Sequence, residues 1–327
     1  ACLFDIKVLS NIKGRYPNQN KLKDLLEIQD LNRPFILSMA IEIKFMSNFF
    51  KELASSNLPC NIVPTQNHDL NATIPASIYI VCGHFIYQIS VMYPRGDFYW
   101  IPRDDFVIKK LSKSLGDYNR AFEKFETIVV EYGSENVIIP FNIDFFLNEY
   151  KRSKFIECKS RSSYINFNKL TYDVKDIVFD YRLGHLKRLF QLNQIEYWLT
   201  GKTLLNWYRE CGLSKCKRAF IGLYSKQLNL KIENFKNRDN FFRIDLKRNI
   251  NNKMFESIIG EENMFHFCLT SEFNRTHMNF EHFINGKVER KIIRKINQMC
   301  SAEILEKKYT IPCNPESVLI EIFDGVK

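Results

Sequence analysis

The stretch "QIEYWLTGKTLLNWYRECGLSKCKRAFIGLY", Gln194 to Tyr224, decides how the second half of the chain is interpreted. It predicts a tight loop that leads into a strand, "AFIGLY", at its end. No Asp or Glu stands between Glu210 and Glu233. The predicted strand therefore lacks acidic side chains, the hard oxygen ligands that Mg²⁺ and similar cations prefer.

Length and composition predict a globular protein of two domains. The chain has 327 residues, more than the roughly 250 to 300 at which a single hydrophobic core stops growing. Hydrophobic residues make up 45% and charged residues 26%, which excludes a disordered or fibrous chain. We expect a mixed α/β fold, with one α/β domain over residues 1–175 and a second over 176–327.

The formal net charge of +10 favours anionic ligands. Nucleic acid is one such class, and "KRAFIGLYSK" interleaves basic and aromatic residues. The Lys and Arg residues are otherwise spread along the chain without a basic arm. We therefore expect no nucleic-acid partner and a phosphorylated or nucleotide-linked ligand instead.

Cysteines and sequons indicate the secretory pathway. The nine cysteines form no CxxC pair, and we expect disulfides or buried thiols rather than a metal site, even for the set Cys211, Cys216, His266 and Cys268. Asn71 and Asn274 begin N-x-T sequons and are the expected glycosylation sites. A membrane anchor, if one exists, is expected before residue 1, since the apolar stretch 76–93 predicts a strand hairpin.

Periodicity and turn residues predict the elements. In the first half we expect two helices over 21–56, an antiparallel meander over 77–101, a helix over 103–127, a strand over 127–132, and a helix capped by Asn142 or Asp144. The polar segment 159–174 marks the domain boundary, placed near residue 175. In the second half we expect a helix over 178–195, strands over 254–260 and 264–273, a hairpin over 300–313, and a helix over 315–323.

The central stretch resembles the fukutin branch of the LicD-type phosphotransferases, which carry a pattern close to W-L-D-S-G-T-L-L-G-W-Y-R-x-C-G. The matching residues are Trp198, Leu199, Thr203, Leu204, Leu205, Trp207, Tyr208, Arg209, Cys211 and Gly212. The segment "YTIPCNPESVLIEIFDG" is similar to the closing element of the family, so the resemblance covers about residues 180 to 325. It implies a nucleotidyltransferase-like α/β domain in the Golgi, and transfer of a phospho-alditol from a nucleotide donor to a glycoprotein.

The resemblance also shows which family residues are missing. The family pattern has two aspartates, D-x-D, before an Ile-Gly pair, and these positions fall on Arg218 and Phe220. A third family carboxylate falls on His266 or a neighbour. The family cofactor, Mg²⁺ or Mn²⁺, thus lacks its ligands here, and we expect no certain cofactor. Two family glycines fall on Lys202 and Asn206, which places side chains where backbone would approach a phosphate.

Two functions follow. The first is a catalytically degenerate member that acts as a binding or accessory protein, for example one that assists an active paralogue. On this interpretation Thr203 caps a helix and Arg209 is a buried structural residue. The alternative is a metal-independent transferase in which Lys215, Lys217 and Arg218 hold the donor diphosphate, with His266 or Glu196 as the base. The expected substrate-binding residues are Thr203, Arg209, Lys217, Arg218 and His266.

Overall fold

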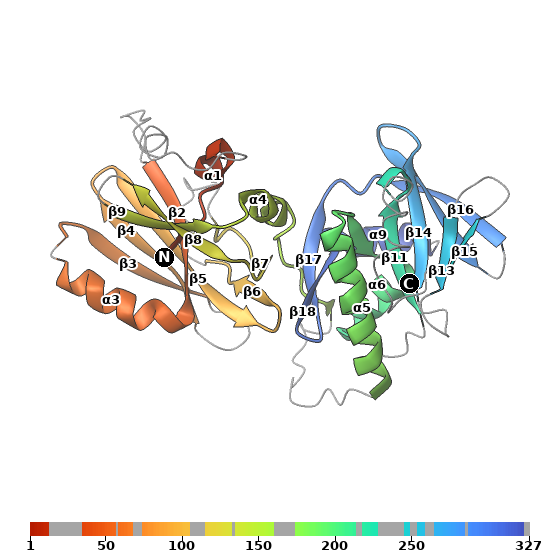
Figure 1. Cartoon of the computed structure of the whole chain (residues 1–327), viewed down its shortest axis with the longest axis horizontal. Coiled ribbons are helices and arrows are strands. Elements are labelled where there is room, and N and C mark those ends of the chain that lie inside the picture. The colour runs from red at the N-terminus through yellow and green to blue at the C-terminus, as the bar shows by residue number, and fades with distance from the viewer. Residues whose placement is uncertain are drawn as a thin grey trace. The chain divides into compact units, whose positions relative to one another are not determined.

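The chain forms two compact units, Ala1–Phe155 and Ile156–Lys327 (Figure 1). A computed structural model describes residues 1–12, 35–56, 58–67, 74–104, 115–132, 135–159, 174–213, 218–227, 245–248, 254–258, 265–284 and 287–323. Each unit mixes helices and strands, so the expected α/β class is confirmed. The predicted boundary segment falls largely on residues 160–173, outside the described part of the chain.

The N-terminal unit is built on one sheet. Among the described residues this sheet has nine strands in the order β3-β4-β5-β2-β1-β9-β8, with β6 joined to β5 and β7 to β6. Its elements are β1 (Cys2–Leu3), α1 (Ile6–Ile12), β2 (Phe35–Glu42), η1 (Ile43–Phe45), α3 (Met46–Ser55), β3 (Asn61–Asn67), β4 (Ile74–Cys82), β5 (Phe85–Arg95), β6 (Phe98–Ile101), β7 (Arg120–Glu123), β8 (Thr127–Tyr132), β9 (Glu135–Pro140) and α4 (Ile143–Lys151).

Three predictions for this unit are confirmed. The strands β4, β5 and β6 pair antiparallel in succession and form the expected meander. Strand β8 covers the expected residues. Helix α4 has Asn142 as its N-cap, and the Asn142 Oδ1 accepts a hydrogen bond of 2.9 Å from the Phe145 backbone N–H. The cap residue therefore fixes where this helix begins.

Two predictions for this unit are wrong. Residues 35–42, expected in a helix, form β2, which pairs in parallel with β5 along its whole length. Residues 120–123, also expected in a helix, form β7 against β6. Both segments are short, and β7 is buried at all four positions although two of them are charged. Periodicity cannot separate a short strand with two covered faces from a buried helix. The rest of the first predicted helix pair is confirmed only at α3, since residues 13–34 lie outside the described residues.

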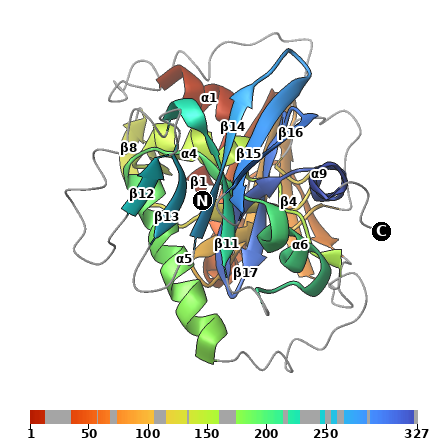
Figure 2. The same cartoon turned by 90° about the vertical axis from the view of Figure 1, so that its right-hand side faces the viewer.

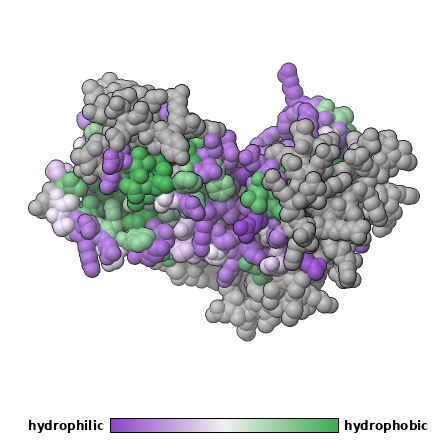
Figure 3. Space-filling view, viewed as in Figure 1, coloured by the Kyte–Doolittle hydropathy of each residue, from purple (hydrophilic) through white to green (hydrophobic). Residues whose placement is uncertain are grey.

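Aromatic rings fill the core of the N-terminal unit. The Phe4 and Phe146 ring centroids lie 4.6 Å apart in an edge-on arrangement, and Phe122 stacks on Phe146. Large apolar side chains also reach the surface, where Val129 is 64% and Phe141 is 57% exposed. Figure 3 shows hydrophobic residues gathering on the visible face of this unit. Within the described residues of the whole chain, no helix has the length and apolarity needed to cross a membrane.

The C-terminal unit combines a sheet, a separate hairpin and three described helices. The sheet has seven described strands in the order β10-β11-β14-β13-β12, and β15 joins β14 to β16. Its elements are α5 (Val174–Leu192), β10 (Tyr197–Leu199), α6 (Gly201–Glu210), β11 (Ala219–Tyr224), β12 (Asp245–Arg248), β13 (Met254–Ile258), β14 (Phe265–Glu272), β15 (His277–Ile284), β16 (Lys287–Arg294), β17 (Met299–Ile304), β18 (Lys307–Pro312) and α9 (Pro315–Ile322). The predicted helices α5 and α9, strands β13 and β14, and hairpin β17–β18 are confirmed.

Disulfides account for most of the cysteines, as expected. Cys158 pairs with Cys211, Cys300 with Cys313, and Cys60 with Cys82. Cys268 is a buried free thiol, and burial raises its pKa well above the ordinary range of a cysteine. The first two disulfides lie in the C-terminal unit, where they attach the segment after Phe155 to the end of α6 and join the two strands of the β17–β18 hairpin.

Candidate functional site

The motif stretch forms a strand, a helix and a strand rather than a tight loop. Residues Gly201 to Glu210, expected in that loop, are helix α6. The helix forms because Leu204 and Trp207 lie one turn apart on a single face, where they are 0% and 1% exposed. Figure 2 shows α6 beside β11 and α9, two elements that it contacts.

Phe220 on β11 anchors the start of α6. The Thr200 backbone N–H donates to the Phe220 carbonyl oxygen at 3.0 Å, and the Phe220 N–H donates to the Thr203 Oγ1 at 2.7 Å. A Cβ at Gly201 would lie 3.3 Å from the Phe220 ring, so the ring covers the first helical residue closely. The expectation that Thr203 caps a helix is wrong. Its hydroxyl sits inside the first turn and fixes α6 to the neighbouring strand.

The three positions expected to carry family carboxylates come together in space. Strands β11 and β14 run parallel, and Phe220 and His266 are register partners. Their rings stack with centroids 5.1 Å apart and an interplanar angle of 16°. Arg218, two residues before Phe220, places its Nη1 3.1 Å from the His266 Nε2. The positions that the resemblance assigned to family carboxylates therefore lie side by side on β11 and β14.

These residues do not fit a divalent cation. A guanidinium group has no acceptor lone pair, and a phenyl ring has no ligand atom. Because arginine only donates hydrogen bonds, the His266 Nε2 must be the acceptor in its contact with Arg218, and this contact occupies that lone pair. Within the described part of the chain, no group of three or more His, Cys, Asp or Glu residues is placed to hold a metal.

Arg218 is suited to an anion instead. Its side chain is exposed, and among the described residues no carboxylate lies within ion-pair distance of it. His266, by contrast, is 5% exposed, so one end of the pair is buried and the other faces solvent. An exposed guanidinium held by a buried partner can form two parallel hydrogen bonds with a phosphate.

One acidic residue that the family pattern does not include occupies a register position beside His266. Glu256 on β13 is the register partner of His266, on the strand opposite the one that carries Phe220. Asp245 pairs with Ile258 one strand farther out, on β12. Glu256 could not be found from motif spacing, because the register of β13 against β14 depends on a connection that carries no family signature.

Of the other residues singled out in the sequence, some lie on α6 and some lie outside the described residues. Arg209 is exposed near the end of α6, so the expectation that it is buried is wrong. Lys202 and Asn206 lie on α6 as well, one exposed and one half-buried, and neither stands in a loop. Lys215, Lys217 and the sequon residue Asn71 lie outside the described residues.

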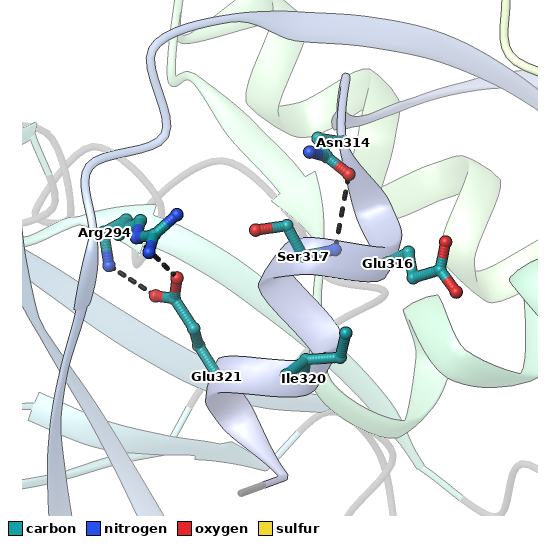
Figure 4. A pocket seen from close by; sticks show the side chains of 6 residues that line it. All are labelled: Arg294, Asn314, Glu316, Ser317, Ile320 and Glu321. Carbon is teal, nitrogen blue, oxygen red and sulfur yellow. Dashed lines mark hydrogen bonds and ion pairs between the residues drawn. The ribbon is translucent and has the colours of Figure 1, made fainter. Parts of the chain in front are cut away.

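A surface hollow of about 430 Å³ lies beside α9, the helix of the closing segment "YTIPCNPESVLIEIFDG" (Figure 4). Its lining residues are Arg294, Asn314, Glu316, Ser317, Ile320 and Glu321. None of them is a predicted site residue. Glu316, one of the lining residues, is hydrogen-bonded to Tyr208 on α6, and burial together with the charge and hydrogen bond of Glu316 raises the pKa of Tyr208.

Comparisons with known proteins point to one group of relatives. The ribitol-5-phosphate transferase FKTN of Mus musculus is 32% identical over 125 residues, which are 36% of this chain and 25% of the relative. The Homo sapiens protein of the same name is 27% identical over 164 residues, 46% of this chain and 33% of the relative. An uncharacterized Caenorhabditis elegans protein is 28% identical over 145 residues, 44% of this chain and 36% of the relative.

These matches support a fukutin-like relationship. The matched segments span only a quarter to a third of the length of the two transferases. No family model matches the chain, and no solved structure matches it. The relationship therefore rests on the aligned segments and does not by itself assign an activity to this chain.

Proposed function

We propose that this chain is a fukutin-like protein of the secretory pathway that binds a nucleotide-linked alditol or sugar phosphate without a divalent cation. In this proposal it acts as a binding or accessory protein for a glycoprotein acceptor or for an active LicD-type paralogue. The contact between Arg218 and His266 carries the proposal, because it stands where the family aspartates would hold the ion. The guanidinium group of Arg218 takes the place of the metal ion.

Several features of the site support this function. The exposed Arg218 offers a diphosphate a charge that needs no metal. The hydrogen bonds of Thr200 and Thr203 to Phe220 hold the start of α6 beside Arg218's strand. The three disulfides suit an oxidising compartment, and the Golgi lumen is the proposed location.

The alternative is an active, metal-independent transferase of the same substrate class. One observation favours it, namely that Arg218 has no acidic partner among the described residues and is free to bind a phosphate during transfer. The Nε2 lone pair of His266 accepts the hydrogen bond of Arg218. His266 can therefore serve as a base only after Arg218 moves to the ligand. A transferase assay with labelled donor separates the two functions.

Calorimetric titration with cytidine diphosphate, with and without Mn²⁺, tests the proposal. We expect binding that is equal under both conditions and that is weakened at least tenfold in Arg218→Gln. The matched control is Arg275→Gln, which removes an exposed arginine of the same unit and should bind like the parent protein. Binding that requires Mn²⁺, or that is unchanged in Arg218→Gln, would overturn the proposal.

A further inference from the structure

We infer that Asn274 is an N-glycosylation site, which would place an N-linked glycan at the tip of the β14–β15 hairpin. Asn274, Arg275 and Thr276 form the connection between these strands, and all three are exposed. The sequon N-x-T is an acceptor pattern for N-linked glycans when it lies in an accessible loop of a secreted protein. This inference goes beyond the proposed function and rests only on its secretory-pathway location, not on the proposed ligand.

The turn brings together the two groups that define the sequon. The Asn274 Oδ1 accepts hydrogen bonds from the backbone N–H groups of Thr276 at 2.9 Å and His277 at 2.8 Å. The Thr276 Oγ1 lies 3.1 Å from the same oxygen and donates to it. The hydroxyl group is thereby held beside the carboxamide, so one enzyme surface can contact both.

The reacting atom of Asn274 is available. In the part of the chain that the structure describes, its Nδ2 donates no hydrogen bond, since the hydrogen bonds of this side chain all involve Oδ1. The hydrogen bonds of Asn274 are also local, because they join it to residues no more than three positions away. The turn can therefore form before the rest of the unit has folded, when the chain enters the compartment.

The reaction needs only one named co-reactant. A lipid-diphosphate-linked oligosaccharide supplies the sugar. A bond forms between the Asn274 Nδ2 and the sugar C1, the bond from C1 to the diphosphate oxygen breaks, and Nδ2 loses one proton. The lipid diphosphate is the leaving group, and nothing is oxidised or reduced.

Two further observations agree with modification at this site. The disulfides Cys60–Cys82, Cys158–Cys211 and Cys300–Cys313 require an oxidising compartment, which is where this donor is used. Phe273, next to Asn274, is 55% exposed, and a glycan would cover part of its apolar surface. A covered Phe273 would reduce the exposed apolar area at the hairpin tip.

The test is expression of the full chain behind a signal sequence in eukaryotic cells, with a reporter sequon attached through a terminal linker. Intact mass is measured before and after enzymatic removal of N-linked glycans, and released sites are mapped as Asn-to-Asp conversions. Asn71→Gln is introduced throughout, so the second natural sequon cannot contribute.

We expect the chain to carry one glycan besides the reporter glycan. Asn274→Gln, Thr276→Ala and Arg275→Pro should each lose it, and Thr276→Ser should retain it, since Ser keeps the hydroxyl and Pro at the middle position blocks the sequon. A modified reporter with an unmodified Asn274 would overturn the inference. A glycan that persists in Asn274→Gln would do the same. Because addition occurs as the chain enters the compartment, a variant that folds poorly still gives an answer.

Discussion

Trp198 lies so close to Gly222 that a Cβ at position 222 would be 2.2 Å from the indole Cε2. The two residues are register partners in the antiparallel pair β10–β11, and Trp198 is fully buried. The tryptophan that opens the motif and the glycine that follows the D-x-D positions therefore form one contact. Because Trp198 is fully buried, this contact belongs to the core of the C-terminal unit.

The first prediction concerns this contact. Gly222→Ala should lower the free energy of unfolding of the C-terminal unit by at least about 1–3 kcal/mol, the usual cost of an overpacked core. Chemical denaturation followed by tryptophan fluorescence measures it. Trp198→Leu combined with Gly222→Ala should cost less than the sum of the two single changes. A stable Gly222→Ala protein with unchanged unfolding would contradict the contact.

A pair of threonines tests how α6 is fixed to β11. Thr203→Val removes the acceptor of the Phe220 N–H and should cost about 1–3 kcal/mol, because a buried donor is left without a partner. Thr200→Val is the matched control, since the Thr200 hydroxyl is fully buried and has no hydrogen-bond partner in the structure. It should be neutral or stabilising. Equal losses in both variants would show that Thr203 contributes only through packing.

The disulfides of the C-terminal unit should differ in their contribution to stability. Cys158 and Cys211 are 53 residues apart, whereas Cys300 and Cys313 are 13 apart. Loop-closure entropy gives about 4 kcal/mol for the first and about 3 kcal/mol for the second. Thermal unfolding of the Cys158→Ala/Cys211→Ala and Cys300→Ala/Cys313→Ala variants measures the order. Cys268→Ala is the control for loss of a buried thiol, and a larger loss for the 13-residue loop would contradict the prediction.

The raised pKa of Tyr93 predicts that the protein loses stability in alkali. Burial raises its pKa from 10.0 to about 12, and its hydroxyl donates to the Pro75 carbonyl oxygen at 2.8 Å. Since the folded pKa lies above the unfolded one, the contribution is complete below pH 10 and is lost as the pH rises toward 12. When the free energy of unfolding is measured between about pH 8 and about pH 12, it should decline less in Tyr93→Phe than in the parent protein. Tyr181→Phe, at an exposed tyrosine, should leave the decline unchanged.

Local signals predicted elements in both units. The Asn142 cap of α4 acts over one turn, so the sequence alone shows it. The apolar stripe of α6 is equally local, yet residues 201–210 were expected in a loop, and this prediction is wrong. Strand β2 could not be recognised, because its partner β5 lies about fifty residues away in the chain and decides its conformation. The same limit applies to β7, whose partner β6 is separated from it by undescribed residues.

For the candidate site, the sequence indicates which residues lie together, while their individual contacts depend on the fold. Motif spacing brought Arg218, Phe220 and His266 to one place because β11 and β14 are adjacent parallel strands. The role of Thr203 depends on a backbone N–H of the next strand, and the exposure of Arg209 depends on which face of α6 packs inward. Neither property can be read from the motif, which records residue types but not neighbours.

The central claim is that Arg218, Phe220 and His266 occupy the ion site of the family. Titration of Mn²⁺ into the parent protein and into Arg218→Asp/Phe220→Asp, followed by electron paramagnetic resonance, tests it most directly. We expect no saturable binding by the parent and a new site in the folded double variant, whose two carboxylates share one face of β11. Saturable binding by the parent, or unchanged Mn²⁺ affinity in a folded double variant, would contradict it.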